Sequence, residues 1–253
     1  ECKGQKYYRC AVNKCVKESF AKSCINVAEG YIHKWRHSYD VIDKIITPSA
    51  FYKKKFEEFG IPGKRVVHIP NFLDTEKPEI NKTNDCEEYY LYFGRLSEEK
   101  GVLTLLRAFQ GIDAKLYIVG TGPIKSDIEE YISAESITNI KVLGFMSGQP
   151  LKDIVGNAKA VILPSEWYEN GPYSAIEALQ MGRPIIGANI AGIPELVDGN
   201  GYLFKSGSPE DLKEQIEKME GLTEAEYQKL KSNSYKLFLN SYTKENHYKK
   251  LEK

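Results

Sequence analysis

Apolar and polar positions alternate along most of this chain in the manner of an α/β protein. After Tyr89, short apolar runs typical of buried strands are separated by longer stretches with helical periodicity. Strands are expected at 89–94, 115–120, 140–145, 160–165, 183–188 and 201–204, and helices at 102–109, 124–134, 151–158, 172–181 and 210–219. Regular alternation of this kind predicts a parallel sheet that helices cover on both faces.

The part of the chain before Tyr89 contains fewer elements and ends in a polar segment. The elements expected there are a helix at 13–39, a strand at 44–49, a helix at 50–59 and a strand at 65–69. Segment 73–87 then loses periodicity and gathers Pro, Asn, Asp and Lys, as exposed interdomain linkers do. The expected organisation is a partial N-terminal α/β domain at 1–72, a linker at 73–87, a Rossmann-like domain at 88–222 and a C-terminal helix at 223–253.

The composition is that of a globular protein, with 253 residues, 42% of them hydrophobic, and a net charge of zero. A neutral chain is a poor candidate for broad nucleic-acid binding. No apolar run approaches the roughly 20 residues that span a bilayer, and no signal peptide is visible. We therefore expect a cytoplasmic protein. Contact of Lys53, Lys54 and Lys55 with the inner face of the membrane is the alternative to a solvated helix face.

The start of the chain carries most of its cysteines. It opens at Glu1 and Cys2, and its first predicted strand comes late, so we expect an N-terminally truncated chain. The odd total of five cysteines does not suggest a closed disulfide framework. Cys2, Cys10 and Cys15 could supply thiolates to a structural zinc ion, although their wide spacing favours reduced thiols.

Two carboxylates flank the predicted start of the helix at 172–181. Glu169 precedes this helix, and Glu177 lies within it, eight positions further along. Pro172 suits a first helical position because its missing N–H costs nothing there, and Gly182 suits the helix end. The pattern therefore predicts that the helix begins just after Glu169.

A helix start at this place predicts an anion site. The backbone N–H groups of Gly171, Tyr173 and Ser174 would point out of the helix end, and the helix dipole adds partial positive charge. Phosphate is the expected anion, and Glu169 and Glu177 would accept hydrogen bonds from sugar hydroxyls beside it. The segment therefore predicts a site for a nucleotide sugar.

An acidic helix start without any ligand is the alternative, because Asp and Glu are favoured in a first helical turn. The strand at 160–165 favours the ligand site, since it places the turn at the carboxyl end of a buried strand. Open α/β sheets bind their ligands at that end.

A second turn with cationic residues follows the strand at 89–94. Gly94 and Arg95 stand directly at the strand end, and Lys100 follows five residues after Arg95. Arg offers a rigid fork to phosphate oxygens and Lys a mobile point charge, so together they can neutralise a leaving nucleoside diphosphate without a metal. Surface cations beside Glu98 and Glu99 are the alternative interpretation.

These segments resemble the retaining glycosyltransferases of family 4, also called group 1, which have the GT-B fold. The resemblance rests on the E-x7-E spacing and on segments 92–109, 118–123, 143–147 and 193–204. It implies two Rossmann-like domains with the active site in the cleft between them. The chain would hold one complete Rossmann-like parallel-sheet domain and the C-terminal part of a preceding α/β domain, and its terminal helix would cross back to the first domain.

The resemblance also implies roles for individual residues. Glu169 would contact the donor sugar near the reacting carbon, Arg95 and Lys100 would bind the diphosphate, and Glu177 would bind the ribose hydroxyls. Catalytic roles would thus fall to Glu169, Arg95 and Lys100, and other donor contacts to Gly94, Phe145, Met146, Asn170, Gly171, Pro172, Tyr173, Ser174 and Glu177. An apolar plug is the alternative for the loop at 145–146. In the loop at 191–195 the family commonly has two glycines, whereas this chain has Ala191 and Gly192.

The implied activity is transfer of a sugar, with retention, from a UDP- or GDP-sugar to a saccharide or lipid-linked acceptor in polysaccharide or glycolipid assembly. It would need no cofactor or metal. A nucleotide-sugar-binding fragment or assembly subunit without catalysis is the main alternative. A glycosidase would have no use for a phosphate cradle, and a dehydrogenase would need a third glycine that segment 120–123 lacks.

Overall fold

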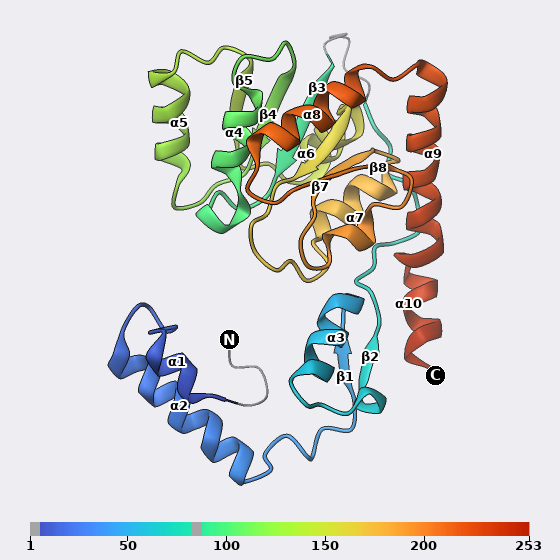
Figure 1. The fold of residues 1–253 in the computed structure, drawn as a ribbon. Helices are drawn as coiled ribbons and strands as arrows, with labels where there is room; N and C mark the ends of the chain where they lie inside the picture. Colours follow the sequence, from blue (N-terminus) through green and yellow to red (C-terminus); the bar gives the residue numbers. More distant parts are fainter. Residues whose placement is uncertain (1–5, 82–87, 253) are drawn as a thin grey trace. The chain divides into compact units, whose positions relative to one another are not determined.

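The computed structural model describes residues 6–81 and 88–252. It divides into two compact units, unit 1 at 1–69 and unit 2 at 70–253, which are described separately (Figure 1). Cys2, one of the three candidate zinc ligands, lies outside the described residues.

Unit 2 is built on one parallel sheet of six strands in the order β5-β4-β3-β6-β7-β8. The strands are β3 (Tyr89–Phe93), β4 (Lys115–Val119), β5 (Ile140–Gly144), β6 (Ala160–Leu163), β7 (Ile185–Ala188) and β8 (Gly201–Phe204). The expected α/β class and all six strands are confirmed. Because the chain runs outward from β3 to β5 and then returns to β6, the direction of the strand order reverses between β3 and β6. Ligands of open α/β sheets bind beside such a point.

Unit 2 also contains helices, several of which lie against this sheet. They are α4 (Val102–Phe109), α5 (Lys125–Ala134), α6 (Gly148–Asn157), α7 (Tyr173–Gln180), α8 (Pro209–Glu220), α9 (Glu224–Ser241) and α10 (Lys244–Leu251). Helix α4 packs against α5 and α8, whereas α7 packs against α6 and α9 (Figure 1). Every residue of β3, β6 and β7 is buried, as expected for a parallel sheet that is covered on both faces.

The C-terminal segment forms two helices instead of the single helix that the sequence predicted. Helix α9 ends at Ser241, and α10 begins after Thr243, whose hydroxyl accepts the N–H of Asn246 as an N-cap. Phe238 of α9 and Tyr242, which directly follows the helix, are buried in the core. This contact fixes α9 against unit 2.

The described part of segment 73–87 runs along unit 2. The side chain of Gln180 donates hydrogen bonds to the carbonyl oxygens of Asp74 and Glu76, at 2.7 and 2.9 Å. Further along, the N–H of Asn81 donates to Asp153 of α6 at 2.9 Å. Residues 70–81 therefore belong to the same compact unit as the sheet.

Unit 1 contains a helix pair and a strand-helix-strand unit. Its elements are α1 (Tyr8–Val12), α2 (Phe20–Trp35), β1 (Ile45–Thr47), α3 (Ala50–Glu58) and β2 (Val66–His68). Strands β1 and β2 pair in parallel, as the predicted strand, helix and strand require. The helix predicted at 13–39 begins only at Phe20, because Lys14, Lys17 and Glu18 have left-handed backbone angles and Ser19 caps the helix.

The cysteines and the apolar segments can now be compared with what the composition led us to expect. Cys10 is buried in α1, and the zinc site with Cys2 and Cys15 stays a prediction. Among the described residues, no helix combines the length and the apolar character that crossing a membrane requires.

Candidate functional site

A small cavity of about 60 Å³ lies at the carboxyl ends of β3 and β6. Its walls come from the two strand ends, from the turns that follow them and from the start of α7. The lining residues are Tyr92, Phe93, Gly94, Arg95, Lys100, Leu163, Pro164, Ser165, Glu169, Pro172, Ser174 and Ile193. Six residues that the sequence singled out thus line one cavity at the point where the strand order reverses.

A partly buried ion pair forms one wall of this cavity. The Nζ of Lys100 lies 2.6 Å from Oε1 of Glu169, and the two side chains are 31% and 15% exposed. The hydroxyl of Ser165 donates to the same carboxylate oxygen at 2.9 Å. Lys100 therefore pairs with Glu169 and not with Glu98 or Glu99, the alternative that the sequence left open.

A close backbone contact brings the two halves of this ion pair together. Gly101 has a φ of +67°, and a Cβ at this position would lie 2.0 Å from the carbonyl oxygen of Pro164. Only glycine therefore allows the turn after β3 to approach the end of β6 this closely. The contact is reinforced where the N–H of Glu166 donates to the carbonyl oxygen of Glu99 at 3.0 Å and Thr104 donates to the Glu166 carboxylate at 2.6 Å.

Tyr92 supports the main chain beneath Arg95. Its hydroxyl donates to the carbonyl oxygen of Arg95 at 2.7 Å. Burial, with a smaller contribution from the charges of Glu169 and Glu99, raises the pKa of Tyr92, so the hydroxyl stays a donor. Tyr92 could not be singled out from the sequence, because it lies inside a continuous apolar run where no polar pattern marks it.

The cations near the cavity also act on Glu99. The hydroxyl of Ser97 donates to the Glu99 carboxylate at 2.7 Å and holds the pKa of that carboxyl below its usual range, with contributions from the charges of Arg95 and Lys100. Arg95 itself is exposed. A phosphate at this place would meet both cations.

Helix α7 starts at the cavity, one residue later than predicted. Pro172 is the N-cap, with a ψ of 131° that keeps it outside the helix, and Tyr173 is the first helical residue. The prediction of Pro172 as the first helical residue is therefore wrong by one position, because the fixed φ of proline suits both places. Within the described part of the chain, the N–H groups of Tyr173 and Ser174 have no acceptor. This helix end can therefore bind an anion.

The two ends of α7 are fixed by specific hydrogen bonds. Before the helix, the side chain of Asn71 donates to the carbonyl oxygen of Gly171 at 2.8 Å. After it, Gly182 adopts a φ of +65° and its N–H donates to Leu179 at 2.9 Å. The predicted helix stop at Gly182 is confirmed.

Glu177 lies about one turn into α7 and does not line the cavity. It is partly buried, and this burial raises the pKa of its carboxyl above the usual range. A ligand that donates hydrogen bonds to Glu177 would favour the ionised form and offset part of that cost.

The other residues with a predicted donor contact do not line the cavity. Phe145 and Met146 follow β5 and do not line the cavity. Phe145 is 73% exposed, so it plugs no apolar core, whereas Met146 packs partly buried against the core. Asn170, Gly171 and Tyr173 lie between or beside the lining residues Glu169, Pro172 and Ser174.

The loop after β7 holds an alanine in a glycine-like conformation. Ala191 has a φ of +52°, in the left-handed region that costs an L-residue roughly 1–2 kcal/mol. Two residues later, Ile193 lines the cavity. Ala191 therefore strains the backbone in the loop where the resemblance led us to expect two glycines.

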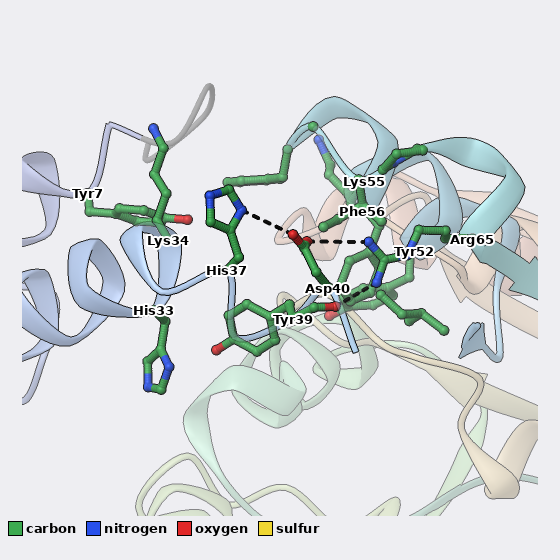
Figure 2. A pocket seen from close by; sticks show the side chains of 15 residues that line it. Tyr7, His33, Lys34, His37, Tyr39, Asp40, Tyr52, Lys55, Phe56 and Arg65 are labelled. Atoms are coloured by element: carbon green, nitrogen blue, oxygen red, sulfur yellow. Dashed lines mark hydrogen bonds and ion pairs between the residues drawn. The ribbon is translucent and has the colours of Figure 1, made fainter. Parts of the chain in front are cut away.

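A larger cavity, of about 760 Å³, lies within unit 1. Figure 2 shows Asp40 between His37, at 3.0 Å, and Arg65, at 3.8 Å. The guanidinium of Arg65 also donates to the main-chain oxygen of Tyr39. The charges of Asp40 and Arg65 offset each other, and none of the predicted site residues lines this cavity. In the described ranges, moreover, no group of three or more His, Cys, Asp or Glu side chains could hold a metal ion.

Comparison with known proteins identifies the family. Residues 74–237 match the family model of the glycosyl transferases group 1. The chain belongs to this family. The matched range contains the whole six-stranded sheet and every residue that lines the small cavity.

Curated relatives match about two thirds of the chain. An uncharacterised glycosyltransferase, MJ1178 of Methanocaldococcus jannaschii, is 28% identical over 176 residues, which are 69% of this chain and 48% of that protein. The lipopolysaccharide 1,2-N-acetylglucosaminetransferase of Salmonella typhimurium is 31% identical, over 63% of this chain and 48% of that one. The chain spans about half the length of these curated relatives.

Solved structures share the fold. Alr3699/HepE from Anabaena, in a crystal structure with UDP, superposes with a TM-score of 0.73 at 21% identity, covering 83% of this chain and 62% of that one. The fold is that of the GT-B glycosyltransferases, as the resemblance implied.

The strain at Ala191 yields a first prediction. Ala191→Gly should raise the free energy of unfolding by about 1 kcal/mol, because glycine adopts a left-handed backbone without steric cost. Chemical denaturation followed by circular dichroism measures the change. Ala134→Gly is the matched control, since Ala134 ends α5 with a negative φ and should lose stability. Equal destabilisation by both substitutions would contradict the strain at Ala191.

Proposed function

We propose that this chain provides the donor-binding part of a retaining glycosyltransferase, which transfers a sugar from a nucleotide sugar to a saccharide or lipid-linked acceptor. One observation carries the proposal: Arg95, Lys100, Glu169 and the start of α7 meet at one cavity at the strand ends. Two cations and a helix N-terminus suit a diphosphate, and a carboxylate beside them suits sugar hydroxyls.

The proposed donor is a UDP-sugar. This choice is supported by the Anabaena protein, whose crystal structure is a complex with UDP. In the proposed arrangement Arg95 and Lys100 bind the diphosphate, the N–H groups of Tyr173 and Ser174 donate to the phosphate nearest α7, and Glu177 accepts from the ribose hydroxyls. The loop at 145–146 contacts the base through its main chain.

The proposed chemistry is mainly electrostatic. The bond between the anomeric carbon and the diphosphate breaks first, and the diphosphate leaves with the electron pair while the sugar becomes oxocarbenium-like. Fixed positive charge at Arg95, Lys100 and the helix end stabilises the departing diphosphate, so the reaction proceeds without a metal ion. The acceptor oxygen then bonds to the same face of the sugar, and its proton passes to the departing diphosphate. Glu169 holds the sugar in position.

The acceptor class is supported by the relatives. The Salmonella protein is named for transfer to lipopolysaccharide, which favours a saccharide acceptor here. Contact of Lys53, Lys54 and Lys55 with a membrane remains a further proposal. Lys55 pairs with Glu58 at 3.1 Å, which leaves Lys53 and Lys54 as the cations for such a contact.

Calorimetric titration with UDP-glucose, GDP-glucose and ADP-glucose tests the proposed site. We expect UDP-glucose to bind, and Lys100→Met to weaken its affinity by roughly 10- to 100-fold, because a charge-assisted hydrogen bond to phosphate contributes about 1.5–3 kcal/mol. Glu169→Gln should retain most of the nucleotide affinity and abolish sugar transfer in the full-length protein.

Lys152→Met is the control for Lys100→Met, because Lys152 is an exposed lysine of α6 outside the cavity. It should leave the titration unchanged. The proposal fails if a folded sample binds none of the three nucleotide sugars, or if the two lysine variants bind UDP-glucose equally well.

The raised pKa of Glu177 predicts a pH dependence of donor binding. Only the ionised carboxylate accepts hydrogen bonds with both oxygens. The affinity for UDP-glucose should therefore fall as the pH is lowered through the pKa of Glu177. Because this pKa is raised, the fall should begin at a higher pH than for an ordinary glutamate, whose pKa is about 4.3. The phosphates of UDP-glucose do not titrate in this range. Because the pKa is raised in the folded state, the effect of Glu177 on folding has the opposite sign and favours folding at low pH.

To check this dependence, the affinity for UDP-glucose is measured for wild type and Glu177→Gln between about pH 4.5 and pH 8, the range in which a glutamate with a raised pKa titrates. The variant should bind more weakly at neutral pH and lack the part of the slope that Glu177 contributes. Identical slopes in both proteins would exclude Glu177 from the donor site.

A further inference from the structure

Large aromatic side chains are exposed next to the candidate site. Trp167 is 65% exposed and Tyr168 is 48% exposed, and both immediately precede Glu169 in the loop between β6 and α7. Tyr173, the first residue of α7, is 54% exposed. Adjacent exposed aromatic residues beside a cavity are unusual in a soluble domain, and they mark a binding surface.

The loop that carries these side chains is held in one conformation. The hydroxyl of Ser165 donates to Glu169 at 2.9 Å and accepts the N–H of Trp167 at 3.5 Å. On the other side, Glu166 is tied to Thr104 at 2.6 Å, and Ser206 donates to the carbonyl oxygen of Ser165 at 3.2 Å. The main chain of Trp167 is thus fixed while its ring remains in solvent, so little backbone order is lost when a ligand binds.

A sugar ring matches this combination of groups. It has an apolar face of C–H bonds, which packs on an aromatic ring, and hydroxyls at its edge, which donate to carboxylates. Trp and Tyr offer large, rigid contact areas at a low cost in conformational entropy. Glu169, directly after Tyr168, binds Lys100 and Ser165 through Oε1, and among residues 6–81 and 88–252 its second oxygen has no hydrogen-bond partner that a hydroxyl would displace.

We propose that Trp167 and Tyr168 form a stacking surface for the acceptor saccharide at the mouth of the donor site. This inference rests on the proposed function and names the part of the site that binds the second substrate. The proposed donor sugar lies beside Glu169, whereas Trp167 and Tyr168 offer exposed aromatic area next to it for a second sugar.

Tryptophan fluorescence tests this surface directly, because the chain has only two tryptophans. In the Trp35→Phe protein, Trp167 is the single reporter. With UDP at saturation, titration with neutral oligosaccharides of glucose, galactose, mannose and N-acetylglucosamine should give a saturable change in emission for at least one of them. Tyr168→Ala should lower the affinity for that saccharide by about tenfold. Tyr248→Ala, with equal exposure in α10, should have no effect.

Other occupants of the surface give different results. A response of Trp167 to UDP alone would assign the surface to the nucleotide, and a response only to vesicles of phosphatidylcholine and phosphatidylglycerol would assign it to a membrane. Either result, or no response to any oligosaccharide, overturns the inference. Calorimetry with UDP-glucose on the same sample distinguishes failure of this inference from failure of the proposed function. If UDP-glucose binds, only the stacking surface is wrong. If it does not bind, the proposed function fails as well.

Transfer kinetics in the full-length protein give an independent check. Trp167→Ala should raise the KM for the acceptor by about tenfold with little change in kcat, and Trp167→Phe should restore most of the affinity, because it keeps an aromatic face. A loss confined to kcat in both variants would contradict a stacking role.

Discussion

The candidate site depends on one close contact between two backbones. Gly101 approaches Pro164 so closely that a Cβ would lie 2.0 Å from the carbonyl oxygen. This contact joins the turn after β3 to the end of β6, which are neighbours in the sheet but 69 residues apart at Lys100 and Glu169. Because neither turn can move independently, the cation and the carboxylate are in place before any ligand arrives, and preorganised charge of this kind acts most strongly on a reaction.

The same contact pairs the cation and the carboxylate that the proposed donor would bind. Lys100 is already paired with Glu169, so under the proposed function a diphosphate would compete for the ammonium group while its sugar would compete for the carboxylate. The hydrogen bond from Ser165 to Glu169 would limit the cost of releasing Lys100. Donor binding would thus exchange one ion pair for two new interactions. The loop that carries Glu169 also carries the exposed residues Trp167 and Tyr168.

Much of unit 2 could be predicted from the sequence, because its parallel strands are continuous apolar runs and its helices have clear periodicity. Gly182 marked a helix end because its left-handed backbone leaves few other residues possible. Three features could not be read from local pattern. Tyr92 lies in a strand that is apolar throughout, and the partner of Lys100 is set by the packing of distant turns. The break between α9 and α10 depends on the cap at Thr243, which competes with an unbroken helical pattern. Arg95, Lys100 and Glu169 could be named in advance, whereas their contacts required the fold.

A double-mutant cycle on donor affinity tests the central claim most directly. UDP-glucose binding is measured for wild type, Lys100→Met, Glu169→Gln and the double variant. If the two residues act as one unit in the donor site, their effects are not additive, and the interaction energy is about 0.5–3 kcal/mol, as for residues in contact. Additive effects within about 0.3 kcal/mol would show that the ion pair plays no part in donor binding and would contradict the account.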